Sequence, residues 1–340
     1  MASPSTITPP ARPGRTETPV VHVEDLTKRF GGVAAVDGIS FDVPPGETFG
    51  FLGPNGAGKS TTINILCTLL RATSGTARVA GYDVTTQAAL VRRHIGLVFQ
   101  DSTVDNYLTA MENLRFHADL YGLDRRRFTV RVRQLLEMVE LWDRRDSLVR
   151  TFSGGMRRRL EIARGLLHAP RVLFLDEPTI GLDPQTRAHI WSYIDQLRAA
   201  EGITIFLTTH HLDEAENCDR IAIIDHGRIV VNDAPAVLKS SIGKDRIELH
   251  TVDDRAAIRA LHDGFGLDAT PNPEGMIFSV ADGEEFVPTL VTGLGVRVLM
   301  VRVSRPTLDD VFMAYTGRTI RDTEADAKER MTGRARMWRR

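Results

Sequence analysis

A glycine-rich segment of eight residues joins an apolar strand expected over 48–52 to a helix expected over 61–70. Its residues are Gly53, Pro54, Asn55, Gly56, Ala57, Gly58, Lys59 and Ser60. They match the spacing G-x-x-x-x-G-K-[ST] in the strand, loop, helix order that this motif requires. Its glycines let successive backbone N–H groups turn toward one anion without clashes from Cβ atoms. The lysine adds a cation for phosphate, and the hydroxyl is an oxygen ligand for Mg²⁺. The segment therefore predicts a nucleotide site.

Two carboxylates follow the apolar strand expected over 172–175, namely Asp176 and Glu177. After a phosphate loop, a carboxylate at a strand end would hold the Mg²⁺ shell. The next one is placed to polarise a water for in-line attack on a γ-phosphate. Two acids after a strand are weak evidence alone and gain weight from the loop before them. Together the two motifs indicate a nucleoside triphosphatase, with Ser60 and Asp176 at the metal and Glu177 as the base.

Four more motifs and one aromatic stand around these two, in an order that resembles the ATP-binding cassette (ABC) ATPases over about residues 20–240. The segment FSGGM resembles the family signature L-S-G-G-Q, and TTHH contains a counterpart of its switch histidine. The matching residues are Ser153, Gly154 and Gly155 in the signature, Asp183 in the D-loop, His210 as the switch histidine, Gln100 in the Q-loop and Phe30 as the aromatic that stacks on adenine.

The resemblance implies a role for each of these residues. The signature lies at a helix start, where N–H groups and the helix dipole would form a second anion site for the γ-phosphate. Gln100 would bring its amide oxygen to Mg²⁺ or to the attacking water, and His210 would donate to the γ-phosphate. Thr61, which follows Ser60, would contact ATP together with the residues of the loop. An aromatic at a strand end is more often a core residue, so Phe30 has that alternative.

The signature departs from the family pattern, with Phe for Leu and Met for Gln. The anion site uses Ser and Gly backbone, so we expect function to survive. The form FSGGMRRRL, together with PTLDDVFMAYTGR near the C-terminus, resembles the daunorubicin/doxorubicin-resistance subfamily of ABC exporters. That likeness implies outward transport of a hydrophobic drug or antibiotic. The arginine run 157–159 needs no partner if it is a solvated helix face.

Strands that alternate with helices predict an α/β fold with a mostly parallel sheet. The resemblance makes it a RecA-like P-loop NTPase fold with an antiparallel β portion. We expect disordered tails over 1–19 and 318–340, an ATP-binding domain over 20–240 and a small C-terminal α/β domain over 245–317. A helical subdomain over about 105–165 is inserted, and T-A-M-E at 109–112 has the spacing of a capping box.

The balance of 43 basic and 44 acidic residues argues against wholesale nucleic-acid binding. Two cysteines predict no disulfide framework. No apolar run approaches the ~18 residues of a membrane-spanning helix, and the proline-rich start lacks the apolar core of a signal peptide.

The resemblance implies a homodimer with ATP between the phosphate loop of one copy and the signature of the other. It also implies a separate membrane permease, which would hold the protein at the cytoplasmic face.

The sequence leaves two alternatives. One is a soluble ABC ATPase of DNA repair or translation. Such proteins carry a long coiled coil or a second cassette, and the sequence has neither a heptad array over 59–176 nor a second phosphate loop. The other is the ATPase of an ABC importer, which the cassette motifs alone do not exclude.

Overall fold

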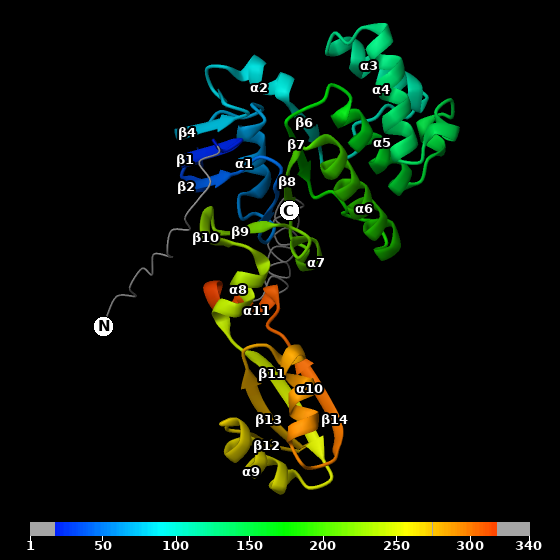
Figure 1. Ribbon diagram of the computed structural model, residues 1–340. Helices are drawn as coiled ribbons and strands as arrows, with labels where there is room; N and C mark the ends of the chain where they lie inside the picture. The colour runs from blue at the N-terminus through cyan, green and yellow to red at the C-terminus, as the bar shows by residue number, and fades with distance from the viewer. Residues whose placement is uncertain (1–17, 274, 318–340) are drawn as a thin grey trace, which may run out of the picture.

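The computed structural model describes residues 18–317 apart from residue 274. The expected tails, up to residue 17 and from residue 318, lie outside this part. Three sheets divide the described chain (Figure 1): an antiparallel sheet near the N-terminus, a central mostly parallel sheet, and an antiparallel sheet in the C-terminal part.

The central sheet has the strand order β10-β9-β3-β8-β7-β6, and all its pairs are parallel except β10 with β9. Its strands are β3 (Thr48–Leu52), β6 (Ile95–Val98), β7 (Val172–Asp176), β8 (Thr204–Thr209), β9 (Arg220–Asp225) and β10 (Arg228–Asp233). Leu52 pairs with Thr209, and Asp176 pairs with Thr208. Because β3, β7 and β8 end at the same edge, the loops after them meet there. The predicted α/β fold with a mostly parallel sheet is confirmed.

The antiparallel sheet near the N-terminus has the order β2-β1-β4-β5. Its elements are β1 (Val21–Phe30), β2 (Val33–Val43), β4 (Ser74–Val79) and β5 (Tyr82–Asp83). The expected strands 20–23 and 39–43 were too short, because β-bulges near Leu26 break the apolar alternation of a long hairpin. Helix α1 (Lys59–Leu66) ends earlier than expected, because Thr68 adopts a left-handed φ of 64°. Helix α2 (Ala88–His94) precedes β6.

Between β6 and β7 the chain forms the helices α3 (Ala110–Leu120), α4 (Arg125–Met138) and α5 (Gly154–Leu166), and two short 3₁₀ turns, η1 (Trp142–Arg144) and η2 (Val149–Thr151). One isolated antiparallel bridge joins Thr109 to Leu148 in this segment. The capping box is present. The Glu112 N–H donates to the Thr109 hydroxyl at 3.1 Å, and the Thr109 N–H donates to the Glu112 carboxylate at 2.7 Å. After β7 come α6 (Pro184–Glu201), α7 (Leu212–Ala215) and α8 (Pro235–Ile242).

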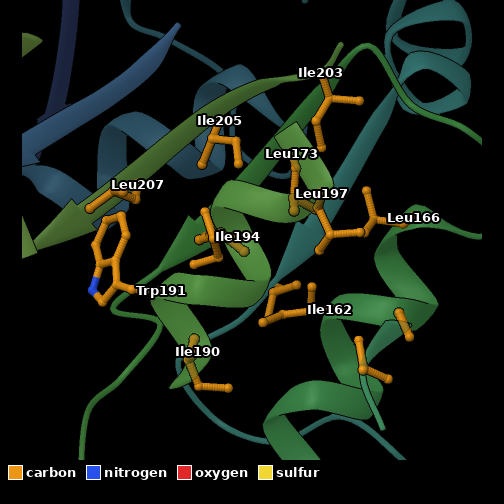
Figure 2. Packing of buried hydrophobic residues seen from close by; sticks show 14 of the residues in the cluster. Ile162, Leu166, Leu173, Ile190, Trp191, Ile194, Leu197, Ile203, Ile205 and Leu207 are labelled. Atoms are coloured by element: carbon orange, nitrogen blue, oxygen red, sulfur yellow. The ribbon is translucent and has the colours of Figure 1, made fainter. Parts of the chain in front are cut away.

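Two hydrophobic cores cover the two faces of the central sheet. On one face, Phe49, Phe174 and Phe206 pack with α1 and the N-terminal sheet, with ring centroids 5.3 Å apart between Phe206 and each of the other two. On the other face, α6 packs on β7 and β8 beside α5 (Figure 2). These cores hold the edge where the strand-end loops converge.

The C-terminal part contains an antiparallel sheet of order β12-β13-β11-β14 with its own core. Its elements are β11 (Asp245–Thr251), α9 (Asp254–Phe265), β12 (Thr270–Asn272), β13 (Gly275–Val280), α10 (Gly283–Gly293) and β14 (Val298–Ser304). The last helix, α11 (Leu308–Thr316), does not pack on this sheet as we expected. Phe312 and Leu308 are buried in the core of the central sheet, where α11 lies against α8 (Figure 1). Of the segment 245–317 that we expected to form one domain, α11 therefore packs with the ATP-binding domain instead.

Candidate functional site

The phosphate loop lies between β3 and α1, where other strands approach it closely. A Cβ on Gly53 would collide with the Ile224 carbonyl, and one on Gly58 would collide with the Ala35 carbonyl. Gly58 and Gly56 also have φ values of 112° and 83°, in the left-handed region that glycine tolerates. The loop therefore needs these glycines for its own packing as well as for a ligand.

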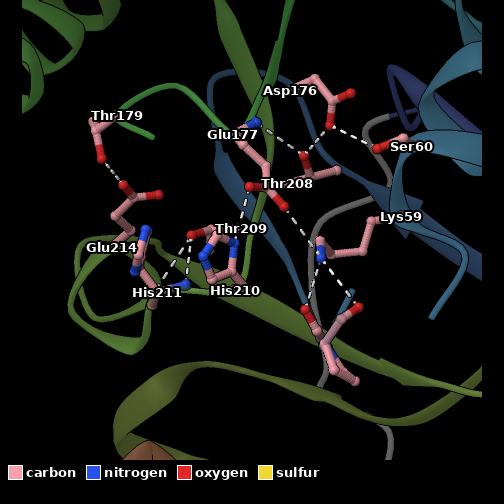
Figure 3. A network of polar contacts seen from close by, with 12 residues as sticks. Lys59, Ser60, Asp176, Glu177, Thr179, Thr208, Thr209, His210, His211 and Glu214 are labelled. Carbon is pink, nitrogen blue, oxygen red and sulfur yellow. Dashed lines mark hydrogen bonds and ion pairs between the residues drawn. The ribbon is translucent and has the colours of Figure 1, made fainter. Parts of the chain in front are cut away.

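Lys59 begins α1, and its side chain turns back into the loop. The ammonium donates to the Gly53 carbonyl at 2.8 Å and to the Pro54 carbonyl at 3.2 Å. It also lies 3.3 Å from Oε1 of Glu177, and both side chains are almost fully buried (Figure 3). The structure thus brings the predicted phosphate cation and the predicted base into one ion pair.

Asp176 and Glu177, at the end of β7, face different partners. The Asp176 carboxylate accepts from the Ser60 hydroxyl at 3.2 Å and from the Thr208 hydroxyl. Glu177 has a left-handed φ of 47°, which costs a non-glycine residue free energy. Its N–H donates to the Thr208 hydroxyl at 3.1 Å. The turn separates the two carboxylates, so that one meets Ser60 and the other meets Lys59.

His210 follows β8, and its Nδ1 lies 2.9 Å from Oε2 of Glu177. Burial alone would raise the pKa of Glu177, but the hydrogen bond from His210 and the charge of Lys59 lower it below its ordinary value. Glu177 is therefore a carboxylate at neutral pH. Burial, and then the neighbouring His210, lower the pKa of His211.

The signature and the D-loop touch each other. Ser153 caps α5 and accepts from the Met156 N–H at 3.3 Å. Asp183 caps α6 and accepts from the Thr186 N–H at 3.0 Å and from its hydroxyl at 2.6 Å, and these bonds lower the pKa of Asp183. A Cβ on Gly155 would lie 2.5 Å from the Thr186 methyl carbon. Thr186 thus joins the two motifs, and no sequence motif pointed to it.

Gln100 and Phe30 lie away from this network. Gln100 is exposed two residues beyond β6. Phe30, at the end of β1, is 52% exposed and carries the Lys28 ammonium 5.0 Å from its ring centroid. It is not a core residue, so the structural alternative for this aromatic is wrong.

Sequence reasoning also missed a buried cation. We expected the run 157–159 to be a solvated helix face, but Arg158 is only 6% exposed. Its guanidinium donates to the carbonyls of Asp176 and Glu177, both at 3.1 Å. Its spacing of five residues from Ser153 could have placed it near the signature, but no local pattern distinguishes it from its two arginine neighbours.

The site offers oxygen ligands rather than a complete metal cage. In the part of the chain that the structure describes, no group of three or more His, Cys, Asp or Glu side chains could hold a metal. Ser60 and Asp176 supply one hydroxyl and one carboxylate, a set that suits Mg²⁺ when phosphate oxygens complete its shell. None of the described helices combines the length and apolar character needed to cross a bilayer.

The chain matches a known protein family. Residues 36–180 match the family described as ABC transporter. The chain is 41% identical over 322 residues to the daunorubicin/doxorubicin resistance ATP-binding protein DrrA of Streptomyces peucetius, which covers 92% of this chain and 97% of DrrA. It is 38% identical over 312 residues to the linearmycin resistance ATP-binding protein LnrL of Bacillus subtilis, covering 89% and 100%.

Two solved structures resemble this chain over about two thirds of its length. The cbiO1 protein of Clostridium perfringens, part of the ABC transporter complex cbiONQ, has a TM-score of 0.62 at 29% identity, covering 65% of this chain and 91% of that one. The ATP-binding cassette MJ0796, in a dimeric post-hydrolysis state bound to ADP and Pi, has a TM-score of 0.57 at 28% identity, covering 63% and 98%.

Proposed function

The chain belongs to the ATP-binding proteins of ABC transporters, which hydrolyse ATP to drive transport, and on this premise we propose that it energises the export of a hydrophobic drug or antibiotic. The named relatives that support this cargo are the daunorubicin/doxorubicin and linearmycin resistance proteins, whose likeness to this chain extends over about nine tenths of its length. The proposal for the site rests on one observation: the buried side chains of Lys59 and Glu177 and the half-buried His210 form a single polar cluster beside the phosphate loop.

The loop residues 53–61 would hold the phosphates of ATP, with Phe30 against the adenine. Its exposed ring suits stacking, because a base needs an open aromatic face. Ser60 and Asp176, with Gln100 from the next loop, would hold Mg²⁺. When bound, that ion neutralises charge on the β- and γ-phosphates.

The reaction assigned to the chain's own residues is in-line attack of water on the γ-phosphate. Lys59 would leave Glu177 for the phosphates and stabilise their developing charge. Glu177, a carboxylate at neutral pH, would then accept the proton of the attacking water. His210 keeps Glu177 oriented through its 2.9 Å contact and would donate to the γ-phosphate.

The signature would act on the ATP of a second copy. Ser153 and Gly154 are exposed at the start of α5, where backbone N–H groups can bind an anion. In a two-fold dimer each interface would carry two equivalent sites, each with a phosphate loop from one chain and a signature from the other. Asp183, which is exposed beside the signature, would lie in the same interface.

The permease has a suitable docking surface on the helical subdomain. A groove of about 500 Å³ lies between β6, α3 and α5, with Phe116 and Leu120 on its α3 wall. These two side chains are 63% and 68% exposed and lie one turn apart on α3, beside the groove. Neighbouring apolar side chains of this kind form a contiguous patch, which marks an interaction site. Phe99 and Thr103 also line the groove, on either side of Gln100 and close to it in sequence. A permease helix seated there would hold the protein at the cytoplasmic face and could displace the Gln100 loop.

Affinity capture from native membranes tests the partner. We expect the wild-type chain to retain a membrane permease and the Phe116→Asp variant to lose it, because a carboxylate would be buried in the apolar contact. The control is Val130→Asp, which adds the same charge to a 57% exposed residue of α4 outside this groove. Equal capture by all three chains would refute the docking surface.

Vesicles that contain the captured complex test the direction of transport. An exporter should accumulate a fluorescent anthracycline inside inverted vesicles when ATP is added outside. Accumulation only in right-side-out vesicles loaded with ATP would identify an importer instead.

A further inference from the structure

Arg158 joins three segments of the cassette through one buried guanidinium. It lies in the second turn of α5, just after the signature, and three successive carbonyls at the end of β7 accept its hydrogen bonds. Nε donates to the Pro178 carbonyl at 2.6 Å, and Nη2 donates to the Asp176 and Glu177 carbonyls, each at 3.1 Å. Nη1 donates to the Phe99 carbonyl, on the residue before Gln100.

The three carbonyls belong to the turn that aims Glu177. Its φ of 47° is unfavourable for a side chain with a Cβ, so the surrounding contacts must hold it. On the N–H side, the turn is held by the bond to Thr208. On the carbonyl side, the Arg158 guanidinium donates to the Glu177 carbonyl at 3.1 Å, and the Ile180 N–H donates to the same carbonyl at 3.3 Å. Without Arg158, the carbonyls at 176–178 would lose a shared donor that is planar and rigid. The Glu177 carbonyl would keep only the longer bond from the Ile180 N–H, so we expect the turn to relax.

A second charged residue on α5 connects Arg158 to the groove between β6, α3 and α5. Glu161, only 2% exposed, accepts from Arg158 Nη1 at 3.2 Å and from the Thr103 N–H at 2.7 Å. Thr103 lines the groove, and its carbonyl accepts from Arg164 of the same helix at 2.9 Å. Burial lowers the pKa of Arg158, and Glu161 opposes this effect, so the pair keeps the cation in place.

We propose that Arg158 is a positioning residue for ATP hydrolysis: its guanidinium holds the left-handed turn at Glu177 and connects it, through Glu161 and the Phe99 carbonyl, to the segment at 99–103. The inference rests on the proposed role of Glu177. One arginine would then both orient the carboxylate of Glu177 and connect it to the residues that line the groove.

The first measurement separates hydrolysis from binding. Arg158→Met keeps much of the side-chain volume and removes every donor. We expect kcat to fall about 10- to 100-fold, since a small misplacement of a reacting group has an effect of that size. The affinity for a fluorescent ATP analogue should stay within about threefold, because the phosphate loop is untouched. Arg159→Met is the matched control, since Arg159 donates to the Val139 carbonyl and the Tyr193 hydroxyl, away from the site.

A double-mutant cycle then asks whether Arg158 acts through Glu177. In the Glu177→Gln background, single-turnover hydrolysis should be no slower after Arg158→Met, because the base that Arg158 positions is already gone. An equal fold-loss in both backgrounds would mean a general structural lesion and would overturn the proposal. Unchanged kcat in Arg158→Met, or a loss of ATP affinity in step with unfolding, would overturn it as well.

If Arg158→Met does not fold, Glu161→Gln replaces it in the same cycle. That variant keeps the guanidinium and removes its buried counter-charge, and we expect a several-fold loss of kcat with unchanged ATP affinity. No change in kcat would then overturn the link. Failure of Glu177→Gln alone to slow hydrolysis would instead refute the proposed function, so the two failures are distinguishable.

Discussion

The ammonium of Lys59 lies 3.3 Å from Oε1 of Glu177, so that the cation of the phosphate loop neutralises the expected base. Two carbonyls of the loop bind the same ammonium. Lys59 would have to exchange these contacts for phosphate oxygens when ATP binds. That exchange would release Glu177 for a water molecule and would make the base available only when substrate is present.

Replacement of the base should separate binding from chemistry. We expect Glu177→Gln to lower kcat about 100-fold or more, the range for loss of a general base. ATP affinity should be kept or increased, since Lys59 no longer has a carboxylate to leave. Turnover with and without the substitution, together with titration of a fluorescent ATP analogue, measures both effects. Glu216→Gln, which lies on the surface in an ion pair with Lys239, is the control. Normal turnover in Glu177→Gln would refute the assignment.

The action of the signature across a dimer can be tested by mixing two inactive chains. Lys59→Ala damages the phosphate loop, and Ser153→Asp keeps the acceptor that caps α5 while placing a negative charge where the γ-phosphate belongs. In a mixed dimer one site collects both lesions and the other collects neither. Random pairing should restore about a quarter of wild-type sites.

Ser153→Arg serves as a second signature variant that blocks the same place by bulk. Size-exclusion chromatography in ATP must show that the mixture dimerises. A mixture that dimerises and never hydrolyses ATP would argue against two independent sites shared between chains.

Stability should depend on pH through His117 in the groove. Burial, with smaller contributions from Arg164 and His168, lowers the pKa of His117 to about 4. Its unfolded pKa is about 6.5, so the unfolded chain binds the extra proton between these values. Stability is then complete above about pH 6.5 and is lost as the pH falls toward 4. Urea unfolding at pH 7 and pH 5 should show a smaller loss for His117→Leu than for the wild type, and equal losses would contradict this account.

The last helix should stabilise the cassette rather than the C-terminal sheet. Phe312 is fully buried against the core of the central sheet, whereas Met313 beside it is 45% exposed. Phe312→Ala should lower the free energy of unfolding by about 3–5 kcal/mol, the range for a large cavity, and Met313→Ala should change it little. Urea unfolding measures both. A deletion from residue 242 onward should therefore destabilise the ATP-binding domain and weaken ATP binding. The positions of the motifs alone predict that binding stays intact, since all of them precede residue 242.

Local features of the site could be predicted from the sequence because neighbouring residues determine them. The glycine loop, the lysine after it and the strand before it form one continuous segment. The capping box at Thr109 likewise needs only residues three apart. The order of the strands and helices also predicted the parallel sheet, since the chain must cross over between parallel neighbours.

Only the tertiary structure decided where Arg158 and α11 lie. The partners of Arg158 are backbone carbonyls at 99 and 176–178, and a carbonyl carries no side-chain signal in the sequence. Helix α11 has apolar residues at helical spacing, which predicts a buried face but not the surface that buries it. The neighbour is settled by packing, because apolar burial is non-directional and α8 offers a complementary face after β14 ends.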